Sequence, residues 1–209
     1  MSLLTCPSFP SQARPRPRAR LDAGILRVCA IAGLATIFAI SAAAAPAQRA
    51  ATNEYDLKAA FLFNFAQFVE WPVESFAKPT TPIVIGVLGD DPFGQSLDEI
   101  VAGETVRDRP LVIQRYRSVD QIEACQILFI SASEAGRLDQ IVKELGHRST
   151  LTVGETAGFA KRSGIIEFAL VQRRLRLRIN LVAATSAHLT VSSKLLRQAE
   201  VVNPDGGRE

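Results

Sequence analysis

Apolar positions recur at helical spacing early in the chain and then give way to short apolar runs. Residues 56–71 predict a first helix, because their large apolar side chains share one face. The phenylalanines here also alternate as on a strand, but the length of the pattern favours a helix. Trp71 precedes Pro72, and a residue before proline avoids the helical region, so the helix should end there. The apolar face consists of Leu57, Phe61, Phe65 and Phe68.

Short apolar runs follow, separated by helical patterns. The predicted strands cover residues 83–88, 111–116, 127–130 and 150–154. Strands that alternate with helices of about a dozen residues indicate a parallel sheet with helical crossovers. The predicted helices cover residues 93–102, 118–124 and 133–145, the last with Ser133 as its cap and Gly146 as its stop.

The pattern changes near the carboxyl terminus. Two predicted strands, residues 165–171 and 174–181, are separated only by Gln172 and Arg173, which indicates an antiparallel hairpin. The second strand alternates arginine with apolar residues, so one of its faces is expected to be buried and the other exposed to solvent. A last helix is capped by Ser192 or Ser193, with Leu195, Leu196 and Ala199 facing inward.

Together these elements predict one α/β domain over residues 55–202. Its sheet is mixed and mostly parallel, has about five to six strands, is flanked by helices and ends in the antiparallel hairpin. Residues 48–54 are expected to form a short linker before the domain, and residues 203–209 a frayed tail after it.

Residues 1–47 have the order of a secretory signal peptide. Arginines precede an apolar run over residues 28–45, and small residues close it at Ala45-Pro46-Ala47, where a signal peptidase would cleave. An uncleaved membrane anchor is the alternative, because a run of this length just spans a bilayer. The alanine-rich run and its small-residue end favour cleavage and export.

Composition and charge narrow the classes of function. The chain is 47% hydrophobic and 22% charged, as a globular protein is, and its pI is about 9.0. The basic excess comes from the leader, because residues 48–209 hold 19 basic and 20 acidic groups. The charge of the mature chain therefore gives no support for a nucleic-acid partner.

Cysteine and histidine are scarce. Cys6 and Cys29 leave with the leader, so Cys125 is expected to be buried, the alternative being a pair between chains. His147 follows a helix stop, where it can interact with the helix dipole, and His188 lies in a predicted turn. Because there is no spaced ligand set, we expect no metal and no cofactor, and without a Gly-x-Ser-x-Gly elbow a serine hydrolase is poorly supported.

The loop after the first predicted strand is one candidate site. Its residues Asp90, Asp91, Phe93 and Gly94 stand between a strand and a helix, where α/β proteins bind ligands. The glycine spacing does not fit a dinucleotide fingerprint, and a receiver domain would need an aspartate within residues 131–133. The loop is then either a structural one, whose aspartates cap the next helix, or a small-molecule site.

The second candidate site is the arginine face of the last hairpin, formed by Arg174, Arg176 and Arg178. Like charges on one strand face repel one another unless opposite charges neutralise them. These arginines form either a solvated outer face, paired with Glu167, or a docking surface for an acidic partner or for lipid headgroups.

Six segments of the chain form a pattern in a fixed order. They are KAAFLFNFAQFVEWP (58–72), VLGDDPFG (87–94), CQILFIS (125–131), LTVGE with GFA (151–160), INL (179–181) and VSSKLL (191–196). No single segment is diagnostic, but the six in register span residues 55–202, and together they resemble the YfiR family of periplasmic proteins.

The resemblance implies a non-enzymatic periplasmic regulator. Family members are similar to a repressor that binds the periplasmic sensor part of a membrane-bound diguanylate cyclase and holds cyclic di-GMP synthesis down. Such a repressor needs only to bind the inactive state better than the active one. A homodimer is also implied. The alternative function is a periplasmic module that binds a small solute through the loop at residues 89–94.

The chain departs from the family pattern in places that bear on function. Family members often have a cysteine at the position of Gly86, placed to pair with Cys125, and this chain lacks it. A common acid of the last strand is Arg178 here, so the partner should be complementary in charge: a different cyclase or another inner-membrane receptor.

Overall fold

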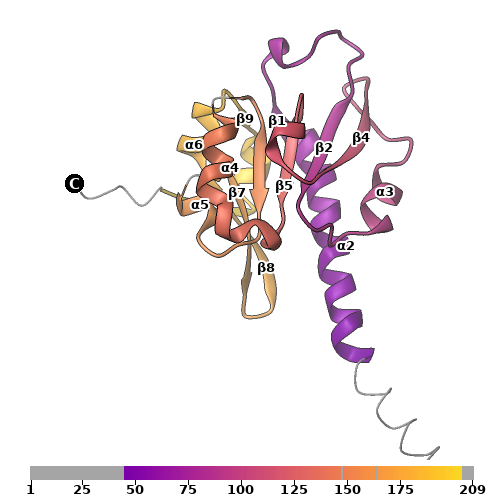
Figure 1. Cartoon of the computed structure of the whole chain (residues 1–209), viewed down its shortest axis with the longest axis vertical. Coiled ribbons are helices and arrows are strands. Elements are labelled where there is room, and N and C mark those ends of the chain that lie inside the picture. The colour runs from indigo at the N-terminus through magenta and orange to yellow at the C-terminus, as the bar shows by residue number, and fades with distance from the viewer. Residues whose placement is uncertain (1–44, 147, 163, 204–209) are drawn as a thin grey trace, which may run out of the picture. The chain divides into compact units, whose positions relative to one another are not determined.

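A mixed eight-stranded sheet organises the residues that the computed structural model describes, which are 45–146, 148–162 and 164–203. Its central strands are buried on both faces, which explains why the sequence shows them as unbroken apolar runs. Figure 1 shows the strands and the helices that flank them. In order across the sheet, the strands are β10 (Ala199–Val202), β8 (Arg174–Asn180), β7 (Ile166–Val171), β6 (Leu151–Gly154), β5 (Ile127–Ile130), β2 (Ile83–Leu88), β4 (Arg109–Tyr116) and β3 (Thr105–Val106).

The strand directions confirm a mixed, mostly parallel sheet. Strands β4, β2, β5, β6 and β7 are parallel to one another, as β8 is to β10, whereas β3 is antiparallel to β4. Strands β7 and β8 form the predicted antiparallel hairpin, and Gln172 and Arg173 at its turn both have positive φ. The expected count of five to six strands is too low, because it missed β3 and β10.

Strand β10 lies where the sequence predicted the end of the last helix. That helix, α7 (Ser193–Leu196), lasts one turn, and Ser192 caps it by accepting the N–H of Leu195. The chain then pairs in parallel with β8, which places Glu200 beside Arg178. The placement of Ala199 inside a helix is therefore wrong. A four-residue strand is too short to show a period of its own in the sequence.

The helices differ from prediction at their ends and in number. The helix predicted over residues 118–124 is only a three-residue 3-10 turn, and the short helices Phe159–Arg162 and Leu181–Ser186 were not predicted. The first helix runs from Ala45 through the residues 48–54 predicted as a linker, and it ends at Phe68, because Val69–Glu70 forms strand β1 against β9 (Thr190–Val191). The predicted helix over residues 133–145 begins instead as a 3-10 turn capped by Ser131. The helices are α2 (Ala45–Phe68), α3 (Gln95–Val101), α4 (Leu138–Leu145), α5 (Phe159–Arg162) and α6 (Leu181–Ser186), with 3-10 turns η1 (Val73–Ser75), η2 (Val119–Gln121) and η3 (Ala132–Arg137).

Helices cover both faces of the sheet. Helices α2 and α3 pack on the face that carries Ile85 and Phe129, whereas α4 packs on the face that carries Leu128 and Ile130. A phenylalanine cluster joins α2 to the sheet. The ring of Phe168 on β7 lies 6.1 Å from that of Phe61 and 6.0 Å from that of Phe65, both on α2, and 6.4 Å from that of Phe129 on β5.

Several predictions fall on residues outside the described ranges. These are the signal peptide, save for its last three residues, His147 and most of the expected tail. None of the helices in the described ranges has the length and apolarity that crossing a membrane requires.

Candidate functional site

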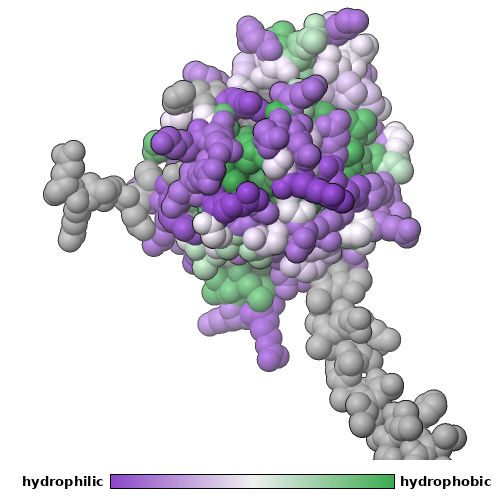
Figure 2. Space-filling view, viewed as in Figure 1, coloured by the Kyte–Doolittle hydropathy of each residue, from purple (hydrophilic) through white to green (hydrophobic). Residues whose placement is uncertain are grey.

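The three arginines of β8 have different surroundings. Arg174 and Arg176 are exposed, and neither makes an ion pair with any residue in the described ranges. Arg178 is only partly exposed and binds two carboxylates, those of Glu167 at 3.3 Å and Glu200 at 3.1 Å. The hairpin projects from the sheet (Figure 1), and in Figure 2 its end is hydrophilic, with a hydrophobic surface between this end and the rest of the domain. The predicted arginine face therefore consists of one arginine paired with two carboxylates and two exposed arginines without an ion pair in the described ranges.

Arg178 belongs to a polar network at the base of the hairpin. The carboxylate of Glu167, 1% exposed, also accepts the N–H of Ala160 at 3.1 Å. Beside it, buried Asn180 donates to the carbonyl of Ala160 at 2.8 Å and accepts the N–H of Ala183 at 2.9 Å, so it caps α6. Hydrogen bonding to Glu200 helps to hold the pKa of Arg178 above its usual value. The pairing with Glu167 expected for a solvated face is present, and it gives Arg178 a structural role.

The loop at residues 89–94 is held by its own contacts. Asp91 accepts the N–H of Phe93 at 2.8 Å and the Nε–H of Arg115 at 2.7 Å. Phe93 is buried against the rings of Tyr55 and Phe129. The aspartates do not cap α3 as expected, because its cap residue is Gly94 and has no side chain.

The crevice expected beside this loop is filled. In open α/β sheets, ligands enter where the carboxyl ends of neighbouring strands diverge, here between β2 and β5. Ser133, which follows β5, instead accepts the N–H of Asp90 at 3.0 Å. A side chain at Gly89 would meet Ser133 and Glu134. Asp90 and Gly94 are exposed on the outer side of the loop.

A buried lysine lies near the same edge of the sheet. Lys58 of α2 binds Glu155 at 2.7 Å and Glu54 at 2.6 Å, and its ammonium lies 4.3 Å from the ring centre of Tyr55. Burial alone would lower the pKa of Lys58, but the hydrogen bonds to Glu155 and Glu54 raise it above its usual value. Lys58 is therefore charged at neutral pH and ties α2 to the chain that follows β6. Sequence reasoning missed this residue, because nothing in the helical pattern marks a buried cation.

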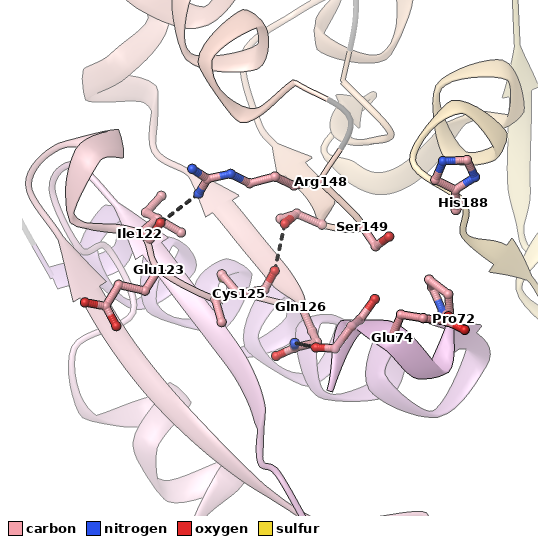
Figure 3. A pocket seen from close by; sticks show the side chains of 12 residues that line it. Pro72, Glu74, Ile122, Glu123, Cys125, Gln126, Arg148, Ser149 and His188 are labelled. Atoms are coloured by element: carbon pink, nitrogen blue, oxygen red, sulfur yellow. Dashed lines mark hydrogen bonds between the residues drawn. The ribbon is translucent and has the colours of Figure 1, made fainter. Parts of the chain in front are cut away.

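A pocket of about 570 Å³ opens at the opposite edge, where β5 and β6 begin (Figure 3). Arg148, Glu123, Glu74 and His188 approach it from separate segments. Arg148 donates to the carbonyl of Ile122 at 2.7 Å. His188 has a φ of 57°, so the predicted turn adopts the left-handed conformation. Within the described ranges, no three His, Cys, Asp or Glu residues come together as a metal site. The pocket can offer positively and negatively charged side chains to a small polar solute.

Cys125 at the edge of this pocket is buried, as predicted. Burial raises the pKa of its thiol to about 12, so the thiolate is scarce at neutral pH. A Cβ atom at Gly86 would lie 2.7 Å from the sulfur of Cys125 and 2.7 Å from the ring of Tyr116. Positions 86 and 125 are therefore neighbours, as the family pattern implies.

Replacing Arg178 tests its structural role. Arg178→Ser should lower the free energy of unfolding by about 1–3 kcal/mol, because the buried carboxylate of Glu167 loses its cation. Arg176→Ser, on the same strand face, should change it by less than about 0.5 kcal/mol. Urea unfolding of the mature chain measures both. Equal effects of the two substitutions would contradict the assignment.

Introducing the missing cysteine tests the geometry at position 86. Oxidised Gly86→Cys should form a disulfide with Cys125 and stabilise the fold by up to about 4 kcal/mol, less the cost of displacing the ring of Tyr116. The measurement is the urea midpoint with and without a reductant, together with a thiol titration in denaturant. The wild-type chain, with Cys125 alone, should not respond to the reductant. Two free thiols after oxidative refolding would show that the geometry is wrong.

Comparisons with known proteins bear on the fold as a whole. No curated protein matches the sequence. One solved structure that aligns is the ABC domain in complex with L-Trp from Streptococcus pneumonia, with a TM-score of 0.43 and 11% identity over 57% of this chain and 55% of that chain. This chain thus spans about half of that protein, and so low a similarity carries no argument. Residues 55–200, in contrast, match the model of a protein family described as YfiR/HmsC-like. That match includes every strand of the sheet except the end of β10, together with α2 from Tyr55 onward, so the chain belongs to the YfiR/HmsC-like family.

Proposed function

We propose that this chain is an exported, non-enzymatic regulator of cyclic di-GMP signalling. It binds the periplasmic sensor part of a membrane-bound diguanylate cyclase, or a similar inner-membrane receptor, and represses it. The observation that carries the proposal is the family match over residues 55–200. The apolar run over residues 28–45 supports export to the periplasm, with cleavage after Ala47 releasing the domain at residues 55–202.

Repression of this kind requires no chemistry on the regulator. A regulator that prefers the inactive sensor about 100-fold moves an even equilibrium to about 99% inactive, which corresponds to about 2.7 kcal/mol of differential binding. A docking surface of ordinary size supplies such a difference. The specificity must then come from the shape and charge of that surface.

The exposed cations of β8 are the proposed docking residues. Arg174 and Arg176 carry charge that no described residue neutralises, and arginine is enriched at protein interfaces. Arg178 contributes indirectly, because its ion pairs fix the strand that presents the other two. The matching surface of the partner should be acidic.

Deletion of the gene tests the function. Cellular cyclic di-GMP should rise on deletion and return to its original level with a restored copy that is exported. A copy that lacks residues 1–47 should not restore it, because the domain then stays on the wrong side of the membrane.

An exported Arg174→Ser/Arg176→Ser variant should also fail to restore the low level, although it folds normally. The control is Arg197→Ser, which removes an exposed arginine outside the hairpin. No change on deletion, in cells that express a cyclase with a periplasmic sensor, would contradict the proposed function.

The pocket of about 570 Å³ favours a second candidate function, the binding of a small solute. Its volume suits a metabolite-sized molecule, and it lies away from the loop at residues 89–94. A solute at 100 times its Kd should stabilise the purified domain by about 2.7 kcal/mol. A thermal-shift screen of polar metabolites measures this effect. Absence of any shift across the screen would remove this candidate.

A further inference from the structure

The end of the β7–β8 hairpin carries apolar side chains that the core does not cover. Leu170 is 58% exposed and pairs across the hairpin with Leu175, which is half-buried. Both lie on the strand face that carries Phe168 and Leu177, which are buried in the core. The apolar face of the hairpin therefore continues beyond the core into solvent. Figure 2 shows a hydrophobic surface between the hydrophilic end of the hairpin and the rest of the domain.

Helix α2 also carries an exposed apolar side chain beyond the phenylalanine cluster. Leu57 is 46% exposed and lies one helical turn before Phe61, whose ring packs on Phe168. The amino-terminal end of α2 and the hairpin end project toward the same end of the domain (Figure 1). The four residues from Leu57 to Phe61 rise about 6 Å along the helix, and the two residues from Phe168 to Leu170 cover about 7 Å. Leu170 and Leu175 thus extend from the phenylalanine cluster along the hairpin as an apolar strip, and Leu57 continues the apolar face of α2 beyond Phe61.

The strip is bordered by positive charge. Residues 170–176 contain Arg173, Arg174 and Arg176 and no acidic residue. Arg174 and Arg176 have no ion pair in the described ranges, and Val171, on their side of the hairpin, is also exposed. An apolar centre rimmed by unpaired arginines matches a partner with an apolar cleft and acidic borders.

We propose that this strip is the anchor by which the hairpin docks on an acidic protein surface, that of the periplasmic sensor domain in the proposed function on which this inference rests. Truncation of a central apolar anchor weakens an interface far more than loss of its rim. The order of residues along the hairpin disfavours a lipid surface. Gln172 and Arg173 lie beyond the apolar pair, so insertion would carry a guanidinium into the hydrocarbon first.

The experiment compares two serine variants with the same exposure. Leu170→Ser removes the anchor, and Val182→Ser removes an apolar side chain of α6 that is 57% exposed and lies outside the hairpin. The probe is the purified periplasmic domain of the cyclase whose output rises on deletion of this gene. Leu170→Ser should weaken binding by at least about tenfold and lose repression in cells, whereas Val182→Ser should bind and repress like the wild type. Urea midpoints of both variants should match the wild type.

The outcomes separate this inference from the function. Full repression and unchanged binding by Leu170→Ser would overturn the anchor while leaving the regulator in place. No change of cyclic di-GMP on deletion would overturn both. Sedimentation of the wild-type chain with phosphatidylglycerol vesicles, lost in Leu170→Ser while binding to the sensor domain persists, would assign the strip to lipid and overturn the protein partner.

Discussion

The contact of Phe168 with the phenylalanines of α2 and β5 is the interaction on which the rest of the structure depends. It joins the first helix, a central strand and the base of the hairpin within one cluster. A sheet with apolar residues on both faces is stable only when helices cover both, and α2 provides much of this cover on its side. Burial of aromatic rings contributes more than any other side-chain burial. Lys58 then fixes where along the sheet the helix sits, because its ammonium must reach Glu155.

The hairpin has a fixed base and an open end. At the base, Phe168 is packed and Glu167 is buried with Arg178, while Asn180 ties the strand to α5 and α6. Toward the end, burial falls from Phe168 to Leu170 on one strand and from Leu177 to Leu175 on the other. An element held in this way presents its outer side chains with little conformational freedom left to lose. Such preorganisation lowers the cost of binding.

The sequence predicts best those elements whose apolar pattern arises from burial alone. The bounds of β2 and β5 agree with prediction, because strands buried on both faces are unbroken apolar runs. Strand β10 was missed because its four residues extend the edge of the sheet and do not form an apolar run of the core. The role of Arg178 was open for the same reason, since Glu200, which binds it, lies on β10. Contacts between segments distant in the sequence were also missed. Nothing in the sequence around Ser133 indicates that its hydroxyl closes the crevice beside Asp90.

The two kinds of residue at the hairpin end govern different parts of association. Exposed arginines attract an acidic partner over distance, so Arg174 and Arg176 bear mainly on the association rate, and salt weakens their effect. Leu170 and Leu175 act only after contact, so they bear on the dissociation rate, where most affinity differences between related complexes arise. A repressor must remain bound for longer than the sensor takes to change state. The apolar strip, rather than the more conspicuous arginines, should therefore determine how completely this chain holds its partner inactive.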